Sequence, residues 1–259
     1  KDGKNAAVTC AVIAKNSKTF MQRLQAIEYV AIAFGRKLLD MIDAVYVTPG
    51  PFALYKKKAI IEVVLFDEKN ITQDIEIVWR LVSHGYNDRM CLSAKVYSET
   101  PSKLKIWLKQ RIRWNIGGTQ CIIKYKDLLF KKKMLGLFII PYFSLNLFLG
   151  LFGLGMFTYL IIRRVLYYYL STKYSVYAQT AILTFQELTF TPSVMNFLGA
   201  TLFIMGSIYT LSVIGIMKEK EVRNKNIFTI LFYMLIYLTL YPFIMVSAMY
   251  KLVRGKYSW

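Results

Sequence analysis

Three long stretches in the second half of the chain carry no charged residue: 134–162, 188–217 and 226–250. The hydrocarbon core of a bilayer requires about 20 apolar residues per helix, and each stretch is long enough. In a soluble protein such helices would need a very large core around them, which a chain of 259 residues lacks. The pattern therefore predicts a transmembrane region over 133–259, with spans at 134–162, 195–217 and 227–250.

The first 132 residues show the patterns of both helices and strands. Over 18–42, apolar residues recur at steps of three and four, which predicts a helix with one buried face: Phe20, Leu24, Ile27, Ala31, Phe34 and Leu38. Further helices are predicted at 59–64, 72–85 and 103–116. Strands are predicted at 6–13, 44–47, 52–55 and 90–97. We therefore expect an α/β domain over 1–132, followed by an all-α transmembrane bundle.

Composition and charge support a membrane protein over a nucleic-acid-binding one. Hydrophobic residues make up 56% of the chain and charged residues 19%, whereas soluble domains have about 45–50% and about 25%. The net charge is +19. In the second half the basic residues gather at the ends of the predicted spans, where they suit anionic lipid headgroups: Lys131–Lys133, Arg163, Arg164, Lys218, Lys220, Arg223, Lys225, Lys251, Arg254 and Lys256. The expected partner is therefore a lipid bilayer, and no nucleic acid is expected.

Two groups of polar residues are candidates for chemistry. Gln110, Arg113 and Trp114 stand at positions i, i+3 and i+4 of a predicted helix, so their side chains share one face. An amide, a guanidinium and an indole together can bind a diphosphate and stack on a sugar ring, although an arginine and a tryptophan at a lipid interface give the same pattern. Asp74 follows Thr72 at a helix start, where a carboxylate is either a cap or a general base.

Other kinds of site are not indicated. His84 is the sole histidine and is expected at the surface, and Cys10, Cys91 and Cys121 have no metal-ligand spacing. Their odd number and wide separation also exclude a disulfide scaffold and suit a reducing compartment. No glycine-rich phosphate loop and no serine nucleophile elbow is present.

The combination of motifs resembles the processive family 2 glycosyltransferases, which are the cellulose, chitin, hyaluronan and poly-N-acetylglucosamine synthases. Thr72-Gln73-Asp74 corresponds to the family's T-E-D tripeptide. Gln110-x-x-Arg113-Trp114 begins 36 residues after Asp74 and corresponds to the family's Q-x-x-R-W motif, which precedes membrane spans. The segment 48–55 is similar to the family segment that approaches the acceptor sugar.

The resemblance implies an inverting transfer of sugar from a nucleotide-sugar donor to a growing glycan. Asp74 would be the general base, and Gln110 and Arg113 would bind the donor diphosphate. Trp114, Gly50 and Pro51 would bind the acceptor. The resemblance also implies a GT-A fold for the α/β part, Mg²⁺ or Mn²⁺ as cofactor, and a multi-pass protein of the cell membrane with its catalytic half in the cytoplasm.

The sequence departs from the family pattern at three points. Gln73 replaces a glutamate beside the expected base, which should then be a weaker base than in relatives. Val64 and Leu65 stand where relatives usually carry two glycines. No D-x-D motif, the family's metal-binding element in the N-terminal half of the GT-A fold, precedes Asp74. We therefore expect this chain to be the C-terminal part of a synthase, which would be a fragment, a split-gene product or a decaying copy. The metal ligands would then lie in a separate N-terminal catalytic chain.

Two alternatives remain open at the level of the sequence. The chain could belong to a transferase that acts on a lipid-linked acceptor, or it could be a non-catalytic membrane subunit or remnant. A channel or transporter is disfavoured, because no predicted span carries an intramembrane charge. Residues 165–187 could form an interfacial or re-entrant helix, which would return the basic C-terminus to the cytoplasmic side.

Overall fold

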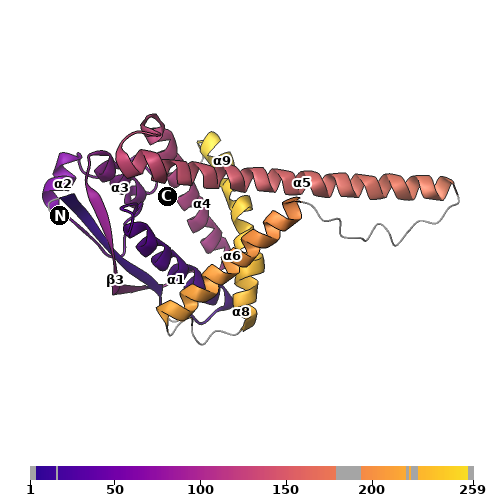
Figure 1. The fold of residues 1–259 in the computed structure, drawn as a ribbon, viewed down its shortest axis with the longest axis horizontal. Coiled ribbons are helices and arrows are strands. Elements are labelled where there is room, and N and C mark those ends of the chain that lie inside the picture. The colour runs from indigo at the N-terminus through magenta and orange to yellow at the C-terminus, as the bar shows by residue number, and fades with distance from the viewer. Residues whose placement is uncertain (1–3, 16, 179–193, 220–221, 223–226, 256–259) are drawn as a thin grey trace.

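The computed structural model describes residues 4–15, 17–178, 194–219, 222 and 227–255. A mixed α/β part comes first and a helical part follows, as expected (Figure 1). The elements of the first part are β1 (Asn5–Ala14), α1 (Phe20–Asp40), β2 (Ala53–Tyr55), α2 (Lys57–Glu62), α3 (Gln73–Ser83), β3 (Asn87–Ser98) and α4 (Leu104–Tyr125). The main helices of the second part are α5 (Ile140–Tyr177), α6 (Val194–Met217), α8 (Ile227–Phe232) and α9 (Tyr241–Val253).

The described residues form a small sheet of three strands in the order β2-β1-β3. β1 lies in the centre, antiparallel to β2 and parallel to β3. Nine of its ten residues are at least partly buried, since both neighbouring strands and helices cover it. The three corresponding strand predictions are confirmed.

The strand predicted at 44–47 is wrong. These residues have no regular secondary structure and join no described strand. Ala44 and Val45 are buried against helices, which accounts for their strand-like apolar character. At the end of the segment the Thr48 N–H donates to the carbonyl oxygen of Asp74 at 3.3 Å, so the backbone turns towards α3 instead of a sheet.

Two hydrophobic cores hold the molecule together. The first joins the start of β1 to α2, α3 and the end of α4, around the fully buried Trp79. The second joins the rest of β1 to α1, and it includes Trp107 of α4 together with Val213 and Tyr237 of the helical part. Packing is thus continuous across the boundary expected at residue 132.

Two helices are long and apolar enough to cross a bilayer, Leu135–Tyr177 and Phe197–Met217. A third candidate, Ile227–Tyr237 with Tyr241–Val253, is bent by 44°. The first part of α5 packs against α4 and α9, and the rest of the helix projects far from the other elements (Figure 1). It runs without a break through Arg163 and Arg164, so the separate helix suggested for 165–187 is wrong up to Tyr177. Residues 179–187 lie outside the described residues.

The turn after α2 has two consecutive residues with positive φ angles, a conformation that favours glycine, although neither residue is glycine. Val64 and Leu65 have φ angles of 66° and 62°, in the left-handed region. A β-branched residue in this region is a genuine outlier, because its Cβ crowds the backbone. Both side chains are exposed, at 79% and 56%, so they gain little from burial in return. Both residues at this turn therefore hold a backbone conformation that glycine adopts more readily.

Restoring glycine at this turn should stabilise the protein. We expect Val64→Gly and Leu65→Gly each to raise stability by about 1 kcal/mol, since a left-handed non-glycine residue costs roughly 1–2 kcal/mol. Thermal unfolding in detergent would measure the change. Ile61→Gly is the matched control, because Ile61 is also exposed but lies in α2, and there glycine should destabilise. Equal effects at the three positions would contradict the prediction.

Candidate active site

A cavity of about 580 Å³ opens between α1, α3, α4 and the loop that contains Thr48. All eight residues selected from the sequence line it: Gly50, Pro51, Thr72, Gln73, Asp74, Gln110, Arg113 and Trp114. They come from three segments separated by up to 64 positions, so only the fold brings them together. Their individual roles stay predictions.

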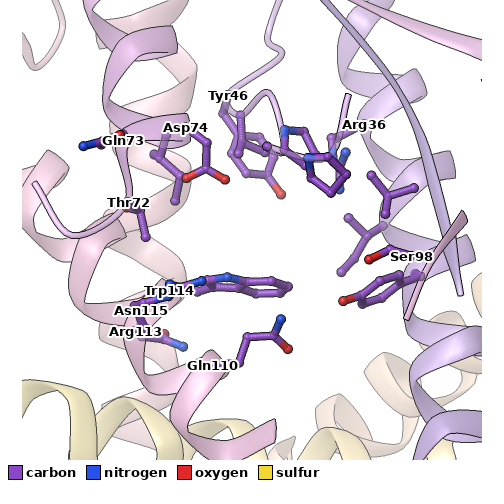
Figure 2. A pocket seen from close by; sticks show the side chains of 18 of the residues that line it. Arg36, Tyr46, Thr72, Gln73, Asp74, Ser98, Gln110, Arg113, Trp114 and Asn115 are labelled. Carbon is purple, nitrogen blue, oxygen red and sulfur yellow. The ribbon is translucent and has the colours of Figure 1, made fainter. Parts of the chain in front are cut away.

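α4 forms one wall of this cavity. Gln110, Arg113 and Trp114 line the same space, as helical spacing predicts. Figure 2 shows the Trp114 indole extending into the middle of the cavity, above the Gln110 amide. Trp114 is half-buried, and a ring that extends into a hollow of this size is suited to stacking on a sugar ring.

Asp74 lies in the first turn of α3, on the wall opposite Arg36 (Figure 2). Its carboxylate points into the cavity. Burial raises the pKa of Asp74. Hydrogen bonds from the backbone of Asp74 and Ile75 oppose that shift, and the positive charges of Arg113 and Arg36 oppose it to a smaller extent. A carboxyl group with a raised pKa is a stronger base once it has lost its proton, which is the property that a general base needs.

The backbone of Asp74 also holds the loop with Gly50 and Pro51. Thr48 donates its N–H to the Asp74 carbonyl oxygen at 3.3 Å, and its hydroxyl lies 2.6 Å from the hydroxyl of Tyr55 in β2. The loop is therefore fastened both to α3 and to the sheet. As a result, Gly50 and Pro51 face the same cavity as Asp74.

Contacts between α4 and the segment before α3 set the distance between the two walls. A Cβ on Gly117 would lie 1.8 Å from Thr72 Oγ1 and 2.6 Å from Thr72 Cβ, so only glycine allows this approach. Gln120 Oε1 accepts from the Ile71 N–H at 3.1 Å, and the Asn70 amide lies 3.4 Å from Cys121 Sγ. Thr72 is the N-cap residue of α3, as predicted, but its side chain makes no capping bond within the described residues.

Two adjacent glycines of α4 allow a direct test of this contact. Gly117→Ala should force Thr72 away and lower stability by about 1–3 kcal/mol, as overpacking does. Gly118→Ala should be neutral or stabilising by up to about 1 kcal/mol, because no described atom lies within 4 Å of its added Cβ. Thermal unfolding of the two variants measures the difference. Equal melting temperatures would show that α4 and Thr72 do not need this close approach.

Gln73 lies at the edge of the site. Figure 2 shows its side chain directed away from the cavity, on the other side of α3 from the Asp74 carboxylate. A glutamate at position 73 would therefore place its charge outside the cavity, and the expectation that its loss weakens Asp74 as a base depends on that more distant charge. That expectation stays a prediction.

Sequence reasoning missed Arg36, which lines the cavity from α1. It is 8% exposed, and its Nε and Nη1 atoms have no hydrogen-bond partner among the described residues. Burial lowers the pKa of Arg36, although Tyr46 and Asp74 oppose the shift. The signal in the sequence was a second row of residues at helical spacing, namely Gln25, Glu28, Arg36 and Asp40. In the structure all four are buried.

A buried guanidinium without a carboxylate partner is costly. We expect Arg36→Met to raise stability by about 1–3 kcal/mol, because it keeps the aliphatic stem and removes the charge. Arg36→Lys keeps the charge and should give no such gain. The measurement is thermal unfolding of the empty protein. A lower melting temperature for the methionine variant than for the lysine variant would contradict the prediction.

The described residues contain no group of three histidine, cysteine, aspartate or glutamate side chains arranged to hold a metal ion. The Mg²⁺ or Mn²⁺ that the sequence resemblance implies therefore has no fitting set of ligands in the described part of the chain. The chemistry considered below uses only the side chains of the cavity.

Comparisons with known proteins identify similar chains. The family model described as glycosyl transferase family group 2 matches residues 1–251. Poly-β-1,6-N-acetyl-D-glucosamine synthases of Staphylococcus aureus (strain COL) and Staphylococcus epidermidis are 30% and 29% identical over 142 and 143 residues. These segments cover 54% and 55% of this chain, but only 34% and 35% of the two synthases. The chain thus spans about a third of the length of the curated relatives that it matches.

A solved structure is also similar. It is a mannosyltransferase from Pyrobaculum calidifontis in complex with GDP-Man and Mn²⁺. The two chains are 13% identical and align with a TM-score of 0.42, over 99% of this chain and 56% of the mannosyltransferase.

Proposed function

The chain belongs to glycosyl transferase family group 2, and we propose that it is the acceptor side and membrane part of an inverting polysaccharide synthase. The observation that carries the proposal is the single cavity lined by Asp74, Arg113 and Trp114. It combines a candidate base for the attacking hydroxyl, a cation for the leaving diphosphate and an aromatic ring on which a sugar can stack. The names of the staphylococcal relatives make an N-acetylglucosamine glycan the first acceptor to test.

In the proposed reaction the terminal sugar of the acceptor stacks on Trp114. Asp74 removes the proton from its hydroxyl as the oxygen attacks the anomeric carbon of the donor. The bond from that carbon to the nucleotide diphosphate breaks, and the electron pair leaves with the diphosphate. Attack from the side opposite the leaving group inverts the anomeric configuration.

Arg113 and Gln110 bind the leaving diphosphate in this proposal. A guanidinium makes charge-assisted hydrogen bonds to phosphate oxygens, and these bonds strengthen as negative charge develops in the transition state. Arg36 lies across the cavity from Asp74. Its Nε and Nη1, which have no hydrogen-bond partner in the described part of the chain, are available to an oxygen of the acceptor or donor sugar, and such a bond would relieve the cost of burial.

The proposal also locates this site at a bilayer. We assign the protein to the cell membrane, with α5 and α6 as spans, because both have the required length and hydropathy. Lys131, Lys132 and Lys133 precede α5 and suit anionic headgroups on the cytoplasmic side, where nucleotide-sugars are available. The nucleotide-binding part, with any metal ligands, comes from elsewhere in the same protein or from a second chain.

Asp74→Asn is the direct test of the proposal. It should lower sugar transfer by about 10²–10⁴-fold while donor binding persists, because an amide keeps the shape of the side chain but cannot accept the proton. Transfer would be measured with radiolabelled nucleotide-sugar in membranes that contain the chain together with the nucleotide-binding part. If the variant transfers sugar at the parental rate, Asp74 is not the general base. If the unmodified chain shows no transfer in this assay, the result favours a non-catalytic subunit.

The same assay gives a pH dependence with a defined sign. Asp74 must be deprotonated to act, so activity falls as the pH is lowered through its pKa. Because burial raises that pKa, the fall should begin at a higher pH than the value of about 3.9 for a solvated aspartate would give. A rate that stays constant down to pH 4 would contradict this assignment.

A further inference from the structure

A buried polar cluster lies behind the α4 wall of the cavity. Arg111 of α4 and Glu28 of α1 form an ion pair in which their exposed fractions are 0% and 3%. Arg111 Nε donates to Glu28 Oε1 at 3.1 Å, and Nη2 donates to Oε2 in a second bond. The hydroxyl of Tyr237 donates to Oε2 at 2.7 Å, and that of Tyr241 donates to Oε1. Both oxygens of the buried Glu28 carboxylate therefore accept two hydrogen bonds each.

Arg111 also contacts two residues of the cavity. Its Nη1 donates to Gln110 Oε1 at 3.0 Å. The Gln110 carbonyl oxygen is thereby held, and the NH₂ group of the amide is left on the side of the cavity, where Gln110 hydrogen-bonds to the Tyr29 side chain. The guanidinium carbon lies 4.0 Å from the centre of the Trp114 ring, a cation–π distance. One buried cation thus orients both the amide and the aromatic platform.

The energetics of buried ion pairs favour a positioning role. Removing two charges from water costs about as much as their attraction returns, so such a pair adds little net stability. It does fix geometry, because each partner has few low-energy positions once both are buried and hydrogen-bonded. For Arg111 this geometry is the one that supports Gln110 and Trp114.

The two tyrosines connect this cluster to the last apolar segment. Tyr237 ends one arm of the segment and Tyr241 begins the next, and the arms meet at an angle of 44°. Their hydroxyls converge on the same carboxylate from either side of the bend. A change in the bend therefore moves at least one of the hydroxyls and disturbs the position of Glu28.

We propose that Arg111 is a positioning residue for the acceptor platform, and that Glu28, Tyr237 and Tyr241 make its position depend on the bend of segment 227–253. The proposal rests on the proposed function, since it takes Trp114 as the platform on which the acceptor stacks. It goes further in naming how the apolar region acts on the site. Sugar binding at Trp114 and the conformation of that segment are then coupled.

The test compares hydroxyl removal at the bend with a matched control. Tyr237→Phe/Tyr241→Phe keeps both rings and removes both bonds to Glu28. Tyr233→Phe is the control, because Tyr233 is buried in the same segment and its ring centre lies 5.3 Å from that of Tyr237, but it makes no hydrogen bond to Glu28 in the described structure. Ile244→Ala is a second control, which lowers stability through a cavity in the same core but removes no hydrogen bond to Glu28.

Two measurements on the whole chain in detergent micelles report the outcome. The first is the ¹⁹F NMR signal of Trp114 in fluorotryptophan-labelled protein, assigned with Trp114→Phe. The second is calorimetric affinity for a β-1,6-linked N-acetylglucosamine oligosaccharide, well below the melting temperature. In Tyr237→Phe/Tyr241→Phe we expect the signal to shift and the affinity to fall about three- to tenfold, equivalent to about one hydrogen bond. Both controls should match the parent.

The outcomes separate this inference from the proposed function. If Trp114→Ala loses oligosaccharide binding while the double tyrosine variant matches Tyr233→Phe in both measurements, the coupling is wrong and the proposed function stands. If Trp114→Ala binds the oligosaccharide as the parent does, Trp114 is not the acceptor platform. The ¹⁹F signal still tests the positioning in that case, because an unshifted signal in the double variant overturns it. An effect of equal size in Ile244→Ala would assign the change to lost stability and would also overturn it.

Discussion

The packing of residues 70–72 against α4 determines whether this molecule has a site at all. Gly117 lets the helix backbone approach Thr72 closely, and Gln120 holds the backbone of Ile71. Asp74 follows two residues after Thr72, and Trp114 lies about one helical turn before Gly117. Without this contact the motifs would be two unrelated segments. With it, a carboxylate and an indole face each other across one cavity.

Much of this arrangement could be predicted from the sequence, since local periodicity sets which side chains of a helix point the same way. The shared face of Gln110, Arg113 and Trp114 follows from their spacing alone. The α/β order and the long apolar helices follow from equally local patterns. The meeting of α3 and α4 does not, because it depends on a glycine whose role is visible only once Thr72 lies against it.

The polar residues of α1 show a second limit of sequence reasoning. The apolar face was predictable, yet a further stripe with Gln25, Glu28 and Arg36 is buried as well. Charged residues are expected at the surface unless they are paired. Glu28 finds its partners at positions 111, 237 and 241, and such distant pairings leave no local pattern. Val64 and Leu65 show another limit. The fold holds both residues at positive φ angles, which the sequence does not predict because these residue types disfavour such angles.

The last apolar segment reads in the sequence as one uninterrupted span, but it bends beside Pro242, which lies in the first turn of its second arm. Its arms have 11 and 13 residues, and neither reaches the roughly 20 that a bilayer core requires. A hydroxyl group facing lipid at the bend would lack a partner, which is costly in hydrocarbon. Tyr237 and Tyr241 instead bond to Glu28. The bend is therefore held by the helices behind the cavity, and the apolar region and the candidate site share one set of contacts.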